Sequence, residues 1–359
     1  MPHSSGERIF IKGNEAIARG ALAAGCQCFF GYPITPQNDI PEFLSTALPE
    51  AGGEFVQAES EVAAANMLLG AAACGKRAMT SSSSPGISLK QEAISYLAGS
   101  ELPAVIVNIS RGGPGLGDIG PSQGDYFQST RGGGHGDYRL LVLAPGSCQE
   151  AYDMTARAFE LAFKYRNPVM VLGDAILGQM KEPVTVAAPH TPDPGEAADW
   201  ALSGAQGRPK RLLKSLFLKD GELADHNQRL QDKYLRMASE IDAETYALED
   251  AELVVVAYGS IGRIVKSTVR RLREQGRRVG LFRPLTVFPF PSKPLQDLAR
   301  KGKHFLTIEH NLGQMVEDVR LAVCPHGSSA LHCCLPGNLP TPEDFEQPIV
   351  KALEDTIHV

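Results

Sequence analysis

Apolar residues in this chain follow two patterns, short continuous runs and longer segments in which they recur with a helical period. The short runs predict buried strands, and the longer segments predict amphipathic helices. Their alternation predicts an α/β fold whose parallel sheet is covered on both faces. In the first half of the chain, the predicted strands are 27–32, 104–109, 139–144 and 168–173, and the predicted helices are 15–24, 87–99 and 148–164.

The stretch Glu54–Gly86 predicts a short strand, a helix of small residues beginning near Val62, a second strand and a serine-rich turn. Glu59 and Glu61 stand where the first strand gives way to the helix. A carboxylate at this position can simply favour the positive end of the helix dipole. It can also lie in a dry site, where desolvation turns it into a proton donor or acceptor. The residues alone leave both interpretations open.

The pattern changes near residue 187, where prolines and alternating charges replace the strand and helix signals. Residues 209–247 keep a helical apolar period, and a second α/β unit begins at the strand 252–258. We therefore expect three parts, a first domain at 1–186, a linking helical arm at 187–250 and a second domain at 251–359. The arm carries a basic cluster at 208–214, which favours a solvated face or a partner-docking arm over an anion site.

Composition is that of a soluble globular protein, with 43% hydrophobic and 21% charged residues. A formal net charge of −6 argues against nucleic-acid binding. The first residues lack the regions of a signal peptide, and no apolar run approaches membrane-spanning length, so we expect a cytoplasmic protein without membrane contact. The seven cysteines show no CxxC spacing, which excludes a zinc site or an iron–sulfur cluster run.

Candidate ligand-binding residues follow the predicted strands. In parallel sheets, ligands bind beyond the carboxyl ends of the strands. Thr35, the run Ser81–Ser84 and Arg111 occupy such positions, and a glycine-rich loop fills residues 111–136. The loop favours close approach to a ligand. The serines can line a pocket or cap the helix that follows, and capping is the interpretation we favour.

Two motifs imitate nucleotide sites. Gly70–Arg77 nearly spells a P-loop, but Arg77 replaces the Ser or Thr that would hold magnesium, and the run ends a helix. Gly115–Gly120 matches GxGxxG after a strand, yet no alanine-rich helix follows. A nicotinamide-dependent enzyme remains an alternative on this motif. The GDG and Asn-Asn strings that hold thiamine diphosphate through magnesium are absent, the nearest being Gly173–Ala175 and His310-Asn311.

Several strings together resemble the alpha subunit of 2-oxoacid:ferredoxin oxidoreductases. They are GYPITP at 31–36, the helix at 59–75, MTSSSSPG at 79–86, the glycine-rich loop at 111–139, KYRNPVMVLGDAILGQM at 164–180, and VVVAYGS, FRPLTVFPFP and EHNLGQM in the second α/β unit. The resemblance covers nearly the whole chain. The loop, with GGPGLG and GGGHGDY, is most similar to the branch acting on 2-ketoisovalerate (3-methyl-2-oxobutanoate).

The resemblance implies a first domain like the pyrimidine-binding domain of thiamine enzymes and a second domain like the transketolase C-terminal domain. Thiamine diphosphate would lie between two chains, with its pyrimidine against this subunit and its diphosphate and Mg²⁺ on a beta subunit. That arrangement accounts for the missing GDG. The [4Fe-4S] clusters would belong to partner chains, with gamma and delta (ferredoxin-like) subunits, ferredoxin as acceptor and coenzyme A as co-substrate.

The resemblance also assigns roles to residues. Glu61 matches the activating glutamate, whose carboxyl group contacts N1′ of the pyrimidine and helps the cofactor lose its thiazolium proton. Glu59 is interpreted as structural. Thr35 matches a threonine near the substrate, and Arg111 matches an arginine that binds the substrate carboxylate. His135 is a further substrate-side candidate. Ser83 and Ser84 would line the pyrimidine pocket unless the serines act only as a cap.

We therefore expect one subunit of an enzyme that oxidatively decarboxylates a branched-chain 2-oxoacid to acyl-CoA and is active only with its partners. Alternatives are 2-oxoglutarate or an aryl 2-oxoacid as substrate, or a docking paralogue that has lost its own site. The presence of Thr35, Glu61 and Arg111 together argues against the docking paralogue.

Overall fold

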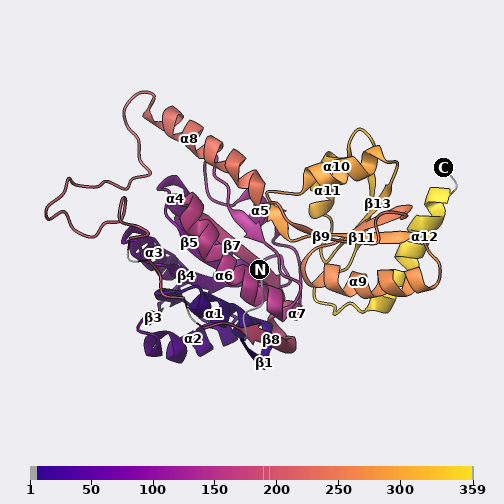
Figure 1. Ribbon diagram of the computed structural model, residues 1–359, viewed down its shortest axis with the longest axis horizontal. Coiled ribbons are helices and arrows are strands. Elements are labelled where there is room, and N and C mark those ends of the chain that lie inside the picture. Colours follow the sequence, from indigo (N-terminus) through magenta and orange to yellow (C-terminus); the bar gives the residue numbers. More distant parts are fainter. Residues whose placement is uncertain (1–5, 189, 194, 358–359) are drawn as a thin grey trace.

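The structure is a computed structural model, and it describes residues 6–188, 190–193 and 195–357 (Figure 1). Two α/β bodies lie side by side along the long axis, with the N-terminal half of the chain in one and the C-terminal third in the other (Figure 1). Each body is built around its own sheet.

The first sheet has seven strands in the order β12-β6-β7-β5-β4-β2-β3. All of them run parallel except β12, which comes from the second half of the chain and pairs antiparallel with β6. The strands are β2 (Cys28–Gly31), β3 (Glu54–Gln57), β4 (Ala78–Ser82), β5 (Ala104–Ser110), β6 (Leu141–Leu143), β7 (Pro168–Asp174) and β12 (Thr286–Phe288).

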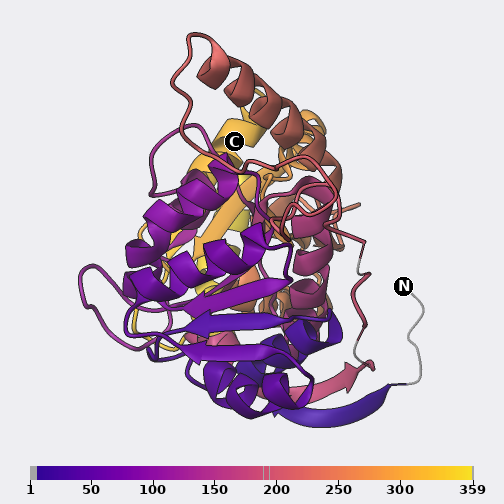
Figure 2. The ribbon, with the colours of Figure 1, turned by 90° about the vertical axis from the view of Figure 1, so that its left-hand side faces the viewer.

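Helices cover both faces of this sheet, as the alternation of patterns predicts (Figure 2). One buried cluster joins the sheet to α1, α2 and α6, and a second cluster joins it to α3 and α4. The helices are α1 (Gly13–Ala23), α2 (Asp39–Glu50), α3 (Glu61–Ala73), α4 (Ser84–Gly99), α5 (Tyr126–Arg131), α6 (Cys148–Tyr165) and α7 (Ala175–Gln179). The predicted strands and helices of this half are confirmed, with small differences at their ends.

Two features of the first body escape the sequence pattern. Helix α2 buries Ile40, Leu44 and Leu48 at a helical spacing, but Pro41 in its first turn and Pro49 near its end make the segment look like a loop in the sequence. Strands β1 (Glu7–Lys12) and β8 (Lys181–Val186) form an antiparallel ribbon. Their residues are far apart in sequence and interrupted by charges, so local periodicity does not reveal the pairing.

The second sheet has the order β14-β13-β10-β11-β9, and only β9 runs antiparallel to its neighbour. Its faces pack against α9 and α12 on one side and α10 and α11 on the other. The elements are β9 (Ala243–Tyr246), β10 (Leu253–Val256), α9 (Gly259–Glu274), β11 (Val279–Pro284), α10 (Ser292–Arg300), β13 (His304–Glu309), α11 (Met315–Val323), β14 (Ser329–Cys333) and α12 (Glu346–Ile357).

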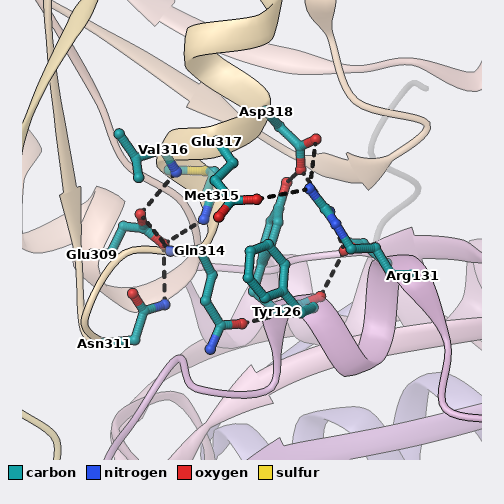
Figure 3. A network of polar contacts seen from close by, with 11 residues as sticks. Tyr126, Arg131, Glu309, Asn311, Gln314, Met315, Val316, Glu317 and Asp318 are labelled. Atoms are coloured by element: carbon teal, nitrogen blue, oxygen red, sulfur yellow. Dashed lines mark hydrogen bonds and ion pairs between the residues drawn. The ribbon is translucent and has the colours of Figure 1, made fainter.

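A polar network joins the two bodies (Figure 3). The Tyr126 hydroxyl of α5 donates to the Asp318 carboxylate of α11 over 2.6 Å, and Arg131 donates to the same carboxylate over 3.1 Å. Behind them, the buried Glu309 carboxylate accepts the backbone N–H groups of Met315 and Val316 at the start of α11, over 2.7 and 2.9 Å. Strand β12, from the second half of the chain, also joins the first sheet, so the two bodies are interlocked. The predicted boundaries at 186 and 250 stay predictions.

The linking segment is less helical than its apolar period predicts. Helix α8 covers only Glu222–Met237, and residues 203–221 extend as an irregular arm (Figure 1). Within the predicted stretch, Gly221 has a positive φ angle directly before α8, which a continuous helix does not accommodate. The predicted helical pattern before 222 is therefore wrong for this part.

Arg77, the residue that breaks the P-loop motif, anchors this segment to the first body. Its guanidinium is 2% exposed and donates to Glu160 and Glu196 over 2.6 Å each. It also donates to the carbonyl of Ala24 over 2.8 Å and lies over the ring of Phe163. In a P-loop this position would carry the Ser or Thr that holds magnesium. Here it carries a buried arginine with a structural role.

We expect Arg77→Met to lower the free energy of unfolding by about 2–4 kcal/mol, because the Ala24 carbonyl and the Glu196 carboxylate lose their donor. Urea unfolding of the variant measures this. Lys293→Met, which breaks the exposed pair with Asp297, is the control and should leave the midpoint within experimental error. Equal midpoints for the two variants would contradict the anchoring role.

Candidate active site

The carboxyl ends of β2, β4 and β5 bring three predicted site residues to one edge of the first sheet. Arg111 follows β5, and its Nη1 donates to the carbonyl oxygen of Thr35, beyond β2, over 2.9 Å. The backbone N–H of Arg111 donates to the hydroxyl of Ser84, beyond β4, over 3.0 Å. Arg111 therefore contacts both Thr35 and Ser84 at this edge of the sheet.

Glu61 is the first residue of α3, and the helix begins there because the Ser60 hydroxyl accepts the backbone N–H of Ala63 over 3.1 Å. The Glu61 side chain is only 7% exposed, whereas Glu59 is exposed. Both interpretations weighed for the acidic pair need a residue in the first turn, but only the dry-site interpretation needs burial. Glu61 meets that requirement, and Glu59 does not.

The Glu61 carboxyl group packs against α4 at Gly86. A Cβ atom at Gly86 would lie 2.8 Å from Glu61 Oε1 and 2.0 Å from the Ser82 hydroxyl oxygen. Real Cβ atoms do not approach so closely, so only glycine lets α4 pass this near to the carboxyl group.

The serine run does not cap α4 as we expected. Ser83 is the N-cap residue, but its hydroxyl makes no capping hydrogen bond. Ser84 is already in the helix, and its hydroxyl donates to the Asp125 carboxylate over 2.6 Å. The capping interpretation is wrong because the Ser83 hydroxyl makes no hydrogen bond with the described residues, and the backbone N–H of Ser84 donates instead to the side-chain oxygen of Asn108 over 3.2 Å.

Two hydroxyls of the run remain available to a ligand. The side-chain oxygens of Ser82 and Ser83 are buried and have no hydrogen-bond partner in the described part of the chain. Buried polar atoms without a partner are unusual in proteins and call for an explanation such as a ligand. A free hydroxyl at Ser82 close to the buried Glu61 carboxyl group, with a second one at the next residue, suits a flat polar ring with hydrogen-bonding nitrogens, so the residues present fit an aminopyrimidine.

Arg111 keeps donors for a further group. Its Nη1 and Nη2 donate to the backbone oxygens of Thr35 and Leu116, over 2.9 and 3.1 Å. Its Nε is buried and has no partner among the described residues. Since a guanidinium has five N–H groups, donors remain for a carboxylate at this edge.

The structure does not bring His135 to this edge. The residue is exposed, and its backbone carbonyl accepts the Ser95 hydroxyl over 2.8 Å. Ser95 lies about 16 Å along α4 from Ser84, at the rise of an ideal helix. Within this chain, His135 therefore lies apart from Glu61 and Arg111, and its contact with substrate stays a prediction.

Three residues of this edge were not found by sequence reasoning. Asp125 also accepts from the Asn108 side chain over 2.8 Å and so joins the ends of β4 and β5. Asn108 is a polar residue inside the apolar run of β5, which is a signal that sequence reading can use. Lys90 is 1% exposed on α4, on the helix stripe shared by Ile87 and Ile94, and this position is also visible in the sequence.

The dinucleotide motif and possible metal sites were compared with the geometry that such sites need. The residues Gly112 to Asp118 form a tight turn closed by an N–H···O bond of 2.9 Å, and no helix follows until α5 at Tyr126, so the dinucleotide geometry is absent there. Among the described residues, no three His, Cys, Asp or Glu side chains gather as a metal site. The helices of the described residues include none that is long and apolar enough to span a membrane.

Comparisons with known proteins agree on one family. Residues 19–205 match the family model of the thiamine-diphosphate-binding part of pyruvate flavodoxin/ferredoxin oxidoreductases. Residues 251–345 match the family model of core domain II of pyruvate:ferredoxin oxidoreductase. Ketoisovalerate oxidoreductase subunit VorB of Methanothermobacter thermautotrophicus is 54% identical over 87% of this chain and 89% of its own length. The 2-oxoglutarate synthase subunit KorA of the same organism is 38% identical over 96% and 99% of the two chains.

Solved structures give the same result. The 2-oxoglutarate:ferredoxin oxidoreductase of Magnetococcus marinus superposes with a TM-score of 0.86 at 26% identity, over 98% of this chain and 66% of that one. A split-gene transketolase superposes with a TM-score of 0.56 at 12% identity, which shows a shared fold. The predicted fold class, a thiamine-enzyme domain followed by a transketolase-like domain, is confirmed. The chain belongs to the 2-oxoacid:ferredoxin oxidoreductase family.

Proposed function

We propose that this chain is the subunit of a ketoisovalerate:ferredoxin oxidoreductase that forms the pyrimidine half of a thiamine diphosphate site. The complex would convert a branched-chain 2-oxoacid and coenzyme A to an acyl-CoA and carbon dioxide, and pass two electrons to ferredoxin. The observation that carries this proposal is the buried Glu61 carboxyl group, packed on Gly86 close to the unpartnered hydroxyl of Ser82. The branched substrate is supported by 54% identity to VorB against 38% to KorA.

Bound thiamine diphosphate supplies a carbon nucleophile and holds the electron pair released when the 2-oxoacid loses its carboxylate. Glu61 would bind N1′ of the pyrimidine and exchange a proton there, in a site whose apolar walls include Ala64 and Ala65. The hydroxyls of Ser82 and Ser83 would orient the ring. Ser84, which we had placed in this pocket, instead holds Asp125 and the backbone of Arg111.

Arg111 would bind the substrate carboxylate through its remaining donors, with Thr35 beside it. The carbonyl of Thr35 fixes one end of the guanidinium, so the exposed Thr35 is held next to Arg111. A fixed guanidinium suits a planar carboxylate better than a mobile one, because less side-chain entropy is lost on binding.

We place the diphosphate, Mg²⁺ and the [4Fe-4S] clusters on partner chains, a beta subunit and gamma and delta subunits. This chain lacks GDG, Asn-Asn and CxxC strings that would hold them. Apolar side chains lie exposed around the candidate site, as expected where a beta subunit completes it. They are Tyr32, Val62, Leu89, Leu116 and Ile119.

Seven free cysteines suit a reducing compartment, and we propose a cytoplasmic location.

Glu61→Ala in the assembled complex should lower kcat for 2-oxoacid decarboxylation by about 10²-fold or more, because the carboxyl group that moves the proton is lost. Glu59→Ala is the matched control and should keep near-normal turnover, since its side chain is exposed. Steady-state assays with a viologen dye measure both. Normal turnover in Glu61→Ala together with a loss in Glu59→Ala would show that the assignment is reversed.

Arg111→Ala should raise the KM for the 2-oxoacid by roughly 10–100-fold, the worth of a charge-assisted hydrogen bond. The affinity for thiamine diphosphate should change much less, because the pyrimidine contacts come from α3 and β4. Titration of the cofactor-free complex gives that affinity. Equal effects on substrate and cofactor would count against a substrate-carboxylate site.

A panel of 2-oxoacids, tested with coenzyme A and the purified complex, decides the substrate. We expect 3-methyl-2-oxobutanoate to have the highest kcat/KM, above 2-oxoglutarate and aryl 2-oxoacids. A preference for 2-oxoglutarate would replace the substrate assignment while keeping the enzyme class. Turnover of none of them would favour a docking paralogue.

A further inference from the structure

A buried lysine lies next to the proposed catalytic carboxyl group, and nothing in the proposed reaction uses it. Lys90 is on α4, one turn after Gly86, so both residues face the start of α3. Gly86 contacts the Glu61 side chain, and Lys90 contacts the Glu61 backbone. At 1% exposure, Lys90 is among the largest fully buried side chains of the described residues.

The Lys90 ammonium joins three elements. Its Nζ donates to the carbonyl oxygen of Glu61 on α3 over 3.3 Å and to the Thr80 hydroxyl on β4 over 3.1 Å. Thr80 in turn donates to the carbonyl of Phe30 on β2 over 2.6 Å, so its oxygen is free to accept from Lys90. The geometry fixes the ammonium beside the first turn of α3.

Burying this charge has a cost that packing alone does not explain. Desolvation lowers the pKa of Lys90 to about 8, and the Glu61 carboxylate opposes that shift. The other contacting groups, a hydroxyl and a backbone carbonyl, are uncharged. A methionine would fill similar space without the desolvation penalty.

We propose that Lys90 is a positioning residue, which holds the first turn of α3 through the Glu61 backbone and supplies a buried positive charge that favours an ionised Glu61 carboxylate. The hydrogen bond to the Glu61 backbone is a contact of the chain itself, and the consequence for the pyrimidine rests on the proposed function. A buried cation beside a carboxylate favours its ionised form, which accepts a hydrogen bond from a protonated ring nitrogen. Lys90 acts through Glu61 and does not itself touch the cofactor.

Lys233 provides a matched control. It is 3% exposed on α8, and its Nζ donates to the Glu101 carboxylate over 3.3 Å and to the carbonyl of Arg166 over 3.2 Å. Burial lowers its pKa to about 8 as well. Lys233→Met therefore removes an equally buried ammonium that has no contact with α3, and it reports the purely structural effect.

The first measurement is an infrared pH titration of the assembled complex without cofactor, with ¹³C-labelled glutamate in this chain alone. The band lost in Glu61→Gln identifies the Glu61 carboxyl group. Lys90→Met should raise the midpoint of that band by about one pH unit or more, since one unit corresponds to a modest charge interaction. Lys90→Arg should stay near the wild type because it keeps the charge, and Lys233→Met should not shift the midpoint.

The second measurement is thiamine diphosphate affinity of the same complexes, followed by fluorescence between pH 5 and 8. The Lys90→Met complex should bind thiamine diphosphate about tenfold more weakly than the wild type near pH 5, and its affinity should recover as the pH rises. A shift of one pH unit in the Glu61 midpoint corresponds to this tenfold change in affinity. A Lys90→Met complex that matches Lys233→Met in both measurements would overturn the proposal. A wild-type complex that binds no thiamine diphosphate would contradict the proposed function, and the titration without cofactor would still decide the role of Lys90.

Discussion

The site depends on the close approach of α4 to the first turn of α3 at Gly86. A side chain at that position would meet Glu61 and Ser82 at once, so the glycine leaves the space in which the carboxyl group is buried. The same approach places Lys90 against the backbone of Glu61. A single small residue thus sets the distance between two helices, the burial of an acid and the position of its nearest cation.

The two α/β bodies hold the other side of the site in place. The chain leaves β5 at Arg111 and is fixed to the second body about a dozen residues later, where the backbone N–H of Gln123 donates to the carbonyl of His310 over 2.8 Å and the Tyr126 hydroxyl binds Asp318. The intervening loop is tied at both ends, yet its apolar tips at Leu116 and Ile119 stay exposed. A loop tied at both ends, with exposed apolar residues between them, suits a surface that a partner chain covers.

Local patterns were sufficient for the buried central strands, most helices and the place of Glu61, because burial on one helix face or in one strand leaves a periodic trace. They failed where a distant residue decides the contact. The first backbone N–H of α4 is bound by Asn108 and not by the Ser83 hydroxyl, and the Ser84 hydroxyl binds Asp125. Lys90 stands on an apolar stripe, so its burial was readable, but its contact with Glu61 required the packing of α3 on α4. The roles of Thr35, Arg111 and His135 came from family resemblance, and periodicity could not supply them.

A structure of the assembled complex with thiamine diphosphate bound tests the central claim most directly. The decisive quantity is the distance between the Glu61 carboxyl oxygens and N1′ of the pyrimidine ring. Our account predicts a hydrogen bond of about 2.6–3.2 Å, with the ring beside the hydroxyls of Ser82 and Ser83 and the diphosphate on the partner chain. A pyrimidine ring bound away from Glu61, or contacted at N1′ by another acid, would contradict it.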